Sequence, residues 1–130
     1  MLHVDEVTSD WSVLLAMSET ENARLLSVIL DGFGYAPLEC RDNSSVFEHL
    51  SKTTPFAAVV DLRLSDSDEI CNLVVERGGV SLVVLLKDEE QDPEEIVAQY
   101  GAEAWESVDA SPENILFVLR QLANQSSPDA

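Results

Sequence analysis

Five short, largely apolar runs, each followed by a stretch with helical character, constrain the fold of this 130-residue chain more than any other feature. The runs lie at residues 12–17, 35–40, 56–61, 80–86 and 103–108, the last being the weakest. Apolar runs without strict alternation are typical of strands buried on both faces of a parallel sheet. Parallel strands need crossover connections, which are right-handed and place helices on both faces. We therefore expect a single doubly wound α/β domain.

The intervening segments carry the periodicity and the end signals of helices. Apolar residues recur at helical spacing within 19–33, 43–52, 68–77, 92–100 and 111–122. Asn43 and Ser44 are candidate N-caps, Pro93 marks the first turn of the fourth helix, and Gly101 follows its end. We expect an N-terminal extension at 1–11, one domain at 12–123, and a polar tail or linker at 124–130.

The charge of the chain excludes two classes of partner. Asp and Glu number 25 against 7 Lys and Arg, giving a net charge of -18. Such a surface repels nucleic-acid phosphates and anionic lipid head groups. We therefore expect no binding of nucleic acid or membrane by this domain.

The sequence favours a cytoplasmic location. Residues 1–10 are polar and acidic and do not resemble a secretory signal, and the longest apolar runs are too short to cross a bilayer. Cys40 and Cys71 have no metal-ligand spacing, and we expect both to be buried free thiols, which suits a reducing compartment. His3 and His49 also lack companions at ligand spacing.

The third apolar run ends in a carboxylate, Asp61, and a polar turn follows it. The carboxyl ends of the strands are where open parallel sheets place their binding and reactive groups. Asp61 is therefore the first candidate for chemistry. We interpret Asp66, farther along the turn, as the cap of the following helix rather than a metal ligand.

At this point the chain resembles the receiver domain of two-component response regulators. The stretch VVDLRLSD at 59–66 resembles the family's phosphoacceptor strand and loop, and GAEAW at 101–105 resembles the family's GADDY. The likeness spans roughly residues 12–122. It implies a flavodoxin-like (βα)5 fold with strand order 2-1-3-4-5 and places Asp61 at the phosphoacceptor position.

The resemblance also implies partner residues, and this chain departs from most of them. The family's metal-binding acidic pair falls on Met17 and Ser18, its hydroxyl on Leu86 and its lysine on Val108. Only Glu19, one position late, carries a carboxylate. We expect no cofactor beyond a weak Mg²⁺ site formed by Asp61 and Glu19, because Mg²⁺ prefers a cage of oxygen ligands that includes carboxylates.

We therefore interpret the chain as a degenerate receiver that works through protein contacts, with weak or no phosphorylation and no other enzymatic activity. One alternative is an Mg²⁺-dependent phosphoacceptor receiver that uses Asp61. A second is a small-ligand domain with an apolar pocket at the carboxyl ends of the first and third strands. That pocket would be lined by Met17, Leu86 and Val108.

Partner contacts are predicted from the same resemblance. The family's partner face corresponds to residues 92–122, with Tyr100, Trp105 and Phe117 as the residues to test. Trp105 falls at the family's aromatic switch position, where we expect fixed packing against Leu86 rather than switching. The expected partner is a signalling protein, either a histidine kinase or an output domain, and a homodimer through this face is a further possibility.

Overall fold

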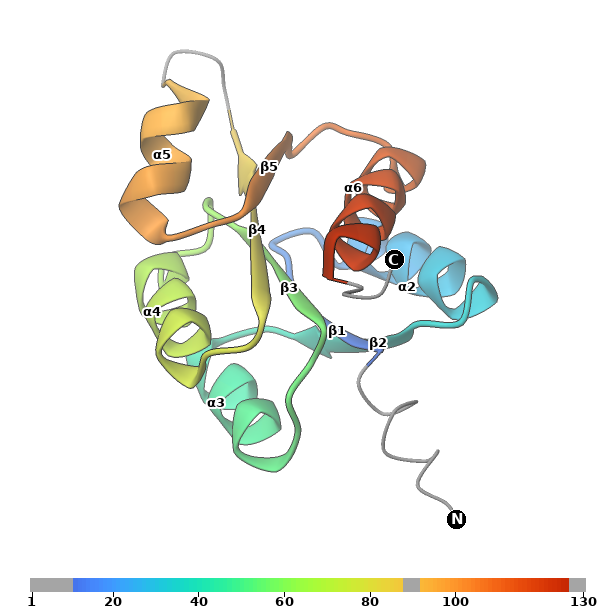
Figure 1. Cartoon of the computed structure of the whole chain (residues 1–130), viewed down its shortest axis with the longest axis horizontal. Coiled ribbons are helices and arrows are strands. Elements are labelled where there is room, and N and C mark those ends of the chain that lie inside the picture. The colour runs from blue at the N-terminus through green and yellow to red at the C-terminus, as the bar shows by residue number, and fades with distance from the viewer. Residues whose placement is uncertain (1–10, 88–91, 127–130) are drawn as a thin grey trace.

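The computed structural model describes residues 11–87 and 92–126, in which strands and helices alternate along the chain (Figure 1). The strands are β1 Ser12–Ala16, β2 Ala36–Cys40, β3 Ala57–Asp61, β4 Ser81–Leu86 and β5 Ala104–Ser107. The helices are α2 Thr20–Gly32, α3 Asn43–Lys52, α4 Ser67–Arg77, α5 Pro93–Tyr100 and α6 Pro112–Ser126. Each strand lies within its predicted run and is shorter by at most one residue at either end.

The strands form one parallel sheet in the order β2-β1-β3-β4-β5, which confirms the predicted flavodoxin-like topology. Helices α2 and α6 cover one face, and α3, α4 and α5 cover the other (Figure 1). Successive residues of a strand point to opposite faces. In β1, Val13 and Leu15 accordingly pack under α2 and α6, whereas Leu14 and Ala16 pack under the other helices. Both faces are buried, so the inner strands are apolar apart from Ser12, Asp61 and Ser81 at their ends.

Most helix ends follow the predicted signals. Pro93 is the first residue of α5, and Gly101 ends that helix with a left-handed φ of 71°. The N-cap of α3 is Asp42, one residue before the predicted Asn43, and its carboxylate accepts the N–H of Ser45 at 2.9 Å. Helix α6 extends to residue 126, so residues 124–126 of the predicted tail are helical. No helix of the described ranges is long and apolar enough to span a membrane.

Asp66 does not cap the helix that it precedes, contrary to the prediction. It stands at the N-cap position of α4, but its side chain makes no capping hydrogen bond there. Its φ of -106° and ψ of 24° depart from the extended conformation usual for an N-cap. Its Oδ2 instead accepts the N–H of Asn43 at 2.9 Å, which satisfies a free donor at the start of α3.

The predictions for residues 1–10, including the N-terminal extension and His3, lie outside the described residues, as do those for tail residues 127–130. Cys40 and Cys71 are buried free thiols, as predicted. Burial raises the pKa of each thiol to about 12, with a smaller contribution from a nearby aspartate.

Candidate functional site

The carboxyl edge of the sheet brings the predicted phosphoacceptor next to the residues that follow β1. Asp61 is the last residue of β3 and is only 1% exposed. The register of β1 and β3 pairs Ala16 with Val60, so Ser18 and Glu19 reach the same edge as Asp61. The family's acidic-pair position is therefore in contact with Asp61, as the resemblance implied, but Ser18 provides a hydroxyl there and not a carboxylate.

Both oxygens of the Asp61 carboxylate accept hydrogen bonds. Ser18 donates to Oδ2 from its hydroxyl at 2.8 Å and from its backbone N–H at 3.2 Å. Arg63 donates to Oδ1 from its backbone N–H at 2.9 Å and from Nε at 3.1 Å. Its Nη2 donates to Oδ2 at 2.8 Å, which completes a bidentate pair between guanidinium and carboxylate. The buried charge of Asp61 is thus neutralised by a residue two positions farther along the chain.

Other carboxylates hold the guanidinium in place. Nη1 of Arg63 lies 3.6 Å from Oε2 of Glu19. The hydrogen bond to Asp61 raises the pKa of Arg63, and the negative charges of Asp61, Glu19 and Asp109 raise it further. The side chain of Arg63 is 27% exposed, so it closes the site from the solvent side. Sequence reasoning did not identify Arg63 as part of the site.

Two opposing effects set the ionisation of Asp61. Burial raises the pKa of Asp61, but the hydrogen bonds from Arg63 and Ser18 together outweigh it and hold the pKa below its ordinary value. The carboxylate is therefore ionised at neutral pH, with its lone pairs directed at these donors. A nucleophilic oxygen would have to lose at least one of these bonds before it could attack phosphorus.

The residues at this edge do not fit a divalent cation. Mg²⁺ needs several oxygen ligands at short range, usually including one or two carboxylates. The two carboxylates predicted as ligands, Asp61 and Glu19, both contact the guanidinium of Arg63, a cation already in the site. Among the described residues, no three His, Cys, Asp or Glu side chains come together as a metal-binding group.

The three residues named for the small-ligand alternative pack on different faces of the sheet. Met17 and Val108 pack with the cluster under α2 and α6. Leu86 belongs to the cluster on the opposite face, under α3, α4 and α5. Two of the three side chains thus pack on one face of the sheet and the third on the other, and the small-ligand pocket stays a prediction.

The residues predicted for switching and partner contact lie on β4, α5, β5 and α6. Trp105 is 42% exposed and pairs in register with Val84, while Leu86 pairs with Ser107. Phe117, on α6, is 60% exposed.

Tyr100 is partly buried, and its hydroxyl donates to Oδ1 of Asp68 at 2.7 Å, which joins α5 to the first turn of α4. Trp105 and Phe117 thus present aromatic surface to solvent, whereas Tyr100 is part of the contact between two helices.

No family model matches this chain, and no curated protein sequence matches it. Solved structures do. A CheY-like response regulator receiver domain protein from Methanospirillum hungatei JF-1 gives a TM-score of 0.79 at 15% identity, covering 92% of this chain and 98% of that one. The receiver domain of TorR, the response regulator of the TMAO respiratory system, gives 0.78 at 12% identity, covering 88% and 97%.

A third structure, the receiver domain of the sensor histidine kinase PA1611 from Pseudomonas aeruginosa PAO1, holds a magnesium ion in its active site cleft. It gives a TM-score of 0.69 at 15% identity, covering 86% of this chain and 96% of that one. At these identities the likeness establishes the fold. The chain has the fold of response-regulator receiver domains.

Proposed function

We propose that this chain is a receiver-like domain of two-component or phosphorelay signalling that acts through protein contacts and takes up little or no phosphate. One observation carries the proposal: the carboxylate at the acceptor position, Asp61, is buried and held on both oxygens by Arg63 and Ser18. The receiver-like fold supports a role in signalling, whereas the contact of Asp61 with Arg63 and Ser18 opposes phosphorylation of Asp61.

Phosphoryl transfer depends on positioning and on neutralising the charge of the transferred group. An aspartyl phosphate at Asp61 would carry nearly two negative charges in place of the single charge of the carboxylate, beside Glu19 and Asp109. The position of the family's lysine holds Val108, which is buried in the core. Arg63 is the cation that contacts Asp61, and its hydrogen bonds already go to the ionised acceptor. Each of these features disfavours phosphorylated Asp61. We also expect Mg²⁺ binding at Asp61 to be weak or absent.

The contact surface in this proposal is the face made by α5, β5 and α6. Trp105 and Phe117 expose large aromatic side chains there, and such residues dominate the energetics of many protein interfaces. The partner would be a signalling protein, either a histidine kinase or an output domain. A homodimer through this face is the second form that the contact could take, although the net charge of -18 on each copy opposes it at low salt.

The test is phosphorylation of the purified protein by acetyl phosphate with Mg²⁺, followed by intact-mass measurement. The Asp61→Asn variant is measured in parallel, because only a gain that depends on Asp61 reports on the acceptor. We expect little or no phosphorylated protein in either sample. A large Asp61-dependent gain of one phosphoryl group in the wild type would refute the proposal and establish the phosphoacceptor alternative.

Partner binding provides the second test. A protein recovered on the immobilised wild type from the source cells is titrated against Trp105→Ala, Phe117→Ala and Asp61→Asn. We expect the first two variants to weaken binding about tenfold, as interface aromatic residues commonly do. Asp61→Asn should leave the affinity nearly unchanged. A large loss with Asp61→Asn alone would mean that the acceptor site is involved in the contact.

A further inference from the structure

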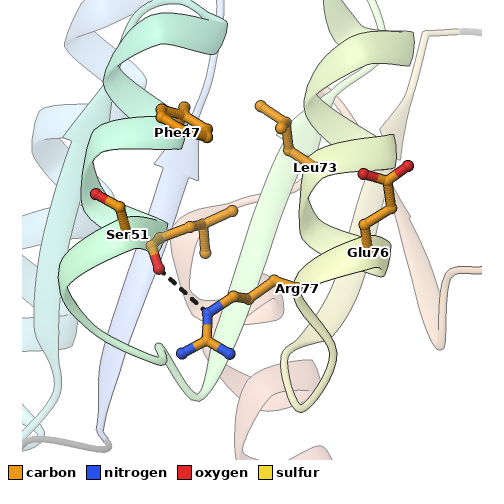
Figure 2. Close-up of a pocket in the computed structure, with 6 residues that line it drawn as sticks. Phe47, Ser51, Leu73, Glu76 and Arg77 are labelled. Atoms are coloured by element: carbon orange, nitrogen blue, oxygen red, sulfur yellow. Dashed lines mark hydrogen bonds between the residues drawn. The ribbon is translucent and has the colours of Figure 1, made fainter.

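Two arginines of this chain bind acceptors of different charge. Arg77, the last residue of α4, donates from Nε to the carbonyl of Leu50 at 3.1 Å, as Figure 2 shows. A second bond joins Arg77 to the hydroxyl of Thr54. These acceptors are neutral, so Arg77 connects α4 to the end of α3 and to the loop after it. Arg63 instead binds carboxylates at the carboxyl edge of the sheet, where its charge is used as well as its hydrogen bonds.

Arg63 joins the loop after β3 to the loop after β1. Its Nη2 donates to Oδ2 of Asp61 at 2.8 Å, and its Nη1 lies 3.6 Å from Oε2 of Glu19. The negative charge of Asp109, in the loop after β5, also raises the pKa of Arg63. Carboxylates from three loops thus act on one guanidinium, which is attached to the chain two residues beyond Asp61.

The guanidinium lies where a divalent cation would have to bind Asp61. Mg²⁺ requires oxygen ligands at about 2.0–2.1 Å in a nearly octahedral arrangement. Both oxygens of Asp61 already accept bonds from Arg63 or Ser18, and Asp61 is only 1% exposed. A cation this close to Oδ2 would also lie near the positive Nη2, and two cations beside one carboxylate repel each other. Arg63 and a divalent cation therefore exclude each other at Asp61.

We propose that Arg63 is the resident counter-ion of Asp61, which keeps divalent cations away from the carboxylate and joins the loops after β1 and β3 without a metal. This inference deepens the proposed function, on which it rests for the acceptor position. With the guanidinium removed, Asp61 and Glu19 supply two carboxylates and Ser18 supplies a neutral oxygen. Mg²⁺ binds such a donor set together with several waters, so the loss of Arg63 should uncover a cation site.

A Mg²⁺ titration of the ¹⁵N-labelled full-length protein, followed by amide chemical shifts, tests this inference. The backbone N–H groups of Ser18 and of position 63 donate to Oδ2 and Oδ1 of Asp61 at 3.2 and 2.9 Å. These two amides therefore report on a cation that reaches the carboxylate. Mg²⁺ that gathers elsewhere on a chain of net charge -18 shifts other amides, so the readout separates local from diffuse binding.

Four variants are compared with the wild type. Arg63→Met removes the guanidinium and retains the backbone N–H at position 63. Arg77→Met is the matched control, because it removes the same charge and two side-chain hydrogen bonds, but those bonds go to neutral acceptors. Asp61→Asn in the Arg63→Met background removes the carboxylate itself. Arg63→Gln repeats the test with a polar side chain in case Arg63→Met does not fold, and circular dichroism establishes the fold of each variant.

We expect no saturable shift of the two amides in the wild type or in Arg77→Met at millimolar Mg²⁺. Arg63→Met and Arg63→Gln should show saturable shifts, with binding at least about tenfold tighter than in the wild type, because no guanidinium competes for Asp61. The double variant should lose these shifts. Saturable shifts of both amides in the wild type, or Arg63 variants that bind no more tightly than Arg77→Met, would overturn the inference.

The titration contains no phosphoryl donor, so its outcome is separate from that of the acetyl phosphate test. A wild type that binds Mg²⁺ at Asp61 and takes up no phosphate would overturn the counter-ion inference and leave the proposed function standing. A wild type that is phosphorylated at Asp61, while the titration gives the expected result, would overturn the proposed function alone.

Discussion

Replacing Arg63 by methionine tests whether the buried charge of Asp61 depends on the guanidinium. Methionine retains much of the aliphatic stem and the backbone N–H bond to Oδ1, but it removes the side-chain bonds to both carboxylate oxygens. Hydrogen bonds to charged groups contribute about 1.5–3 kcal/mol each. Ser18 still donates two bonds to Asp61, and the side chain of Arg63 is 27% exposed. We therefore expect the free energy of unfolding at pH 7 to fall by about 2 kcal/mol, near the low end for one such bond.

The pH dependence of this loss identifies its cause. In the folded wild type the pKa of Asp61 is lowered, and the unfolded-state pKa is about 3.9. Ionised Asp61 therefore stabilises the fold above about pH 4, and the contribution is lost as the pH falls through the folded-state pKa. In Arg63→Met, burial still raises the pKa of Asp61, but fewer hydrogen bonds oppose it. The difference in stability between the two proteins should be large near pH 7 and should shrink below about pH 4.

Urea unfolding at pH 7 and pH 3.5, followed by tryptophan fluorescence, measures the difference in stability between the wild type and Arg63→Met at each pH. Lys52→Met is the control. Lys52 pairs with Glu48, and the two side chains are 68% and 67% exposed. Loss of this surface ion pair should change the free energy of unfolding by less than about 0.5 kcal/mol. The double variant Asp61→Asn with Arg63→Met should be more stable than Arg63→Met alone at pH 7, because it leaves no unpaired buried charge. An equal loss at both pH values, or a double variant no more stable than the single one, would refute the reasoning.

Three further predictions concern other parts of the molecule. Cys40 and Cys71 should not react with a thiol reagent at pH 8 in the native protein and should both react in urea, because burial raises the pKa of each to about 12. The pKa of Tyr100 is raised to about 12, chiefly by its hydrogen bond to Asp68. The contribution of this hydrogen bond to stability is therefore complete below about pH 10 and is lost as the pH rises toward 12. Ultraviolet titration of the wild type minus Tyr100→Phe should show this, and Asp68→Asn should move the transition to lower pH. Gly101→Ala should destabilise the protein by about 1–2 kcal/mol in thermal unfolding, because Gly101 has a φ of 71° and an added Cβ would lie 3.4 Å from a methyl group of α4.

The fold was predictable because its signals are local and repeat along the chain. Each strand is an apolar run buried on two faces, and residues such as Pro93 and Gly101 mark helix ends through their own backbone preferences. Asp66 illustrates the limit of local signals. Its position before a helix correctly gave the N-cap site, but its carboxylate bonds to Asn43, a residue 23 positions earlier. A hydrogen bond between two helices depends on their packing, which no local pattern encodes.

The central ion pair of the site was missed for a related reason. Strand order places Asp61, Ser18 and Glu19 at one edge of the sheet, so their proximity could be predicted. The direction of the Arg63 side chain depends on the turn after β3, which folds it back onto Asp61. One signal was nevertheless present in the sequence. Of the Lys and Arg residues that follow strands at this edge, Arg41, Arg63 and Lys87, only Arg63 lies within two residues of Asp61.

A cation that is part of the chain differs in one respect from a cation that is bound from solution. Arg63 is two residues from Asp61, so its local concentration at the carboxylate is fixed by the turn and does not depend on the medium. A metal ion could approach Asp61 only in those molecules in which Arg63 has left. If the guanidinium contact stabilises the closed arrangement by about 2 kcal/mol, roughly one molecule in 30 is open at a given moment. The apparent affinity of Asp61 for any external cation is then lowered by the same factor of about 30. Arg63 therefore stays the counter-ion of Asp61 under conditions in which an exposed carboxylate would exchange ions freely.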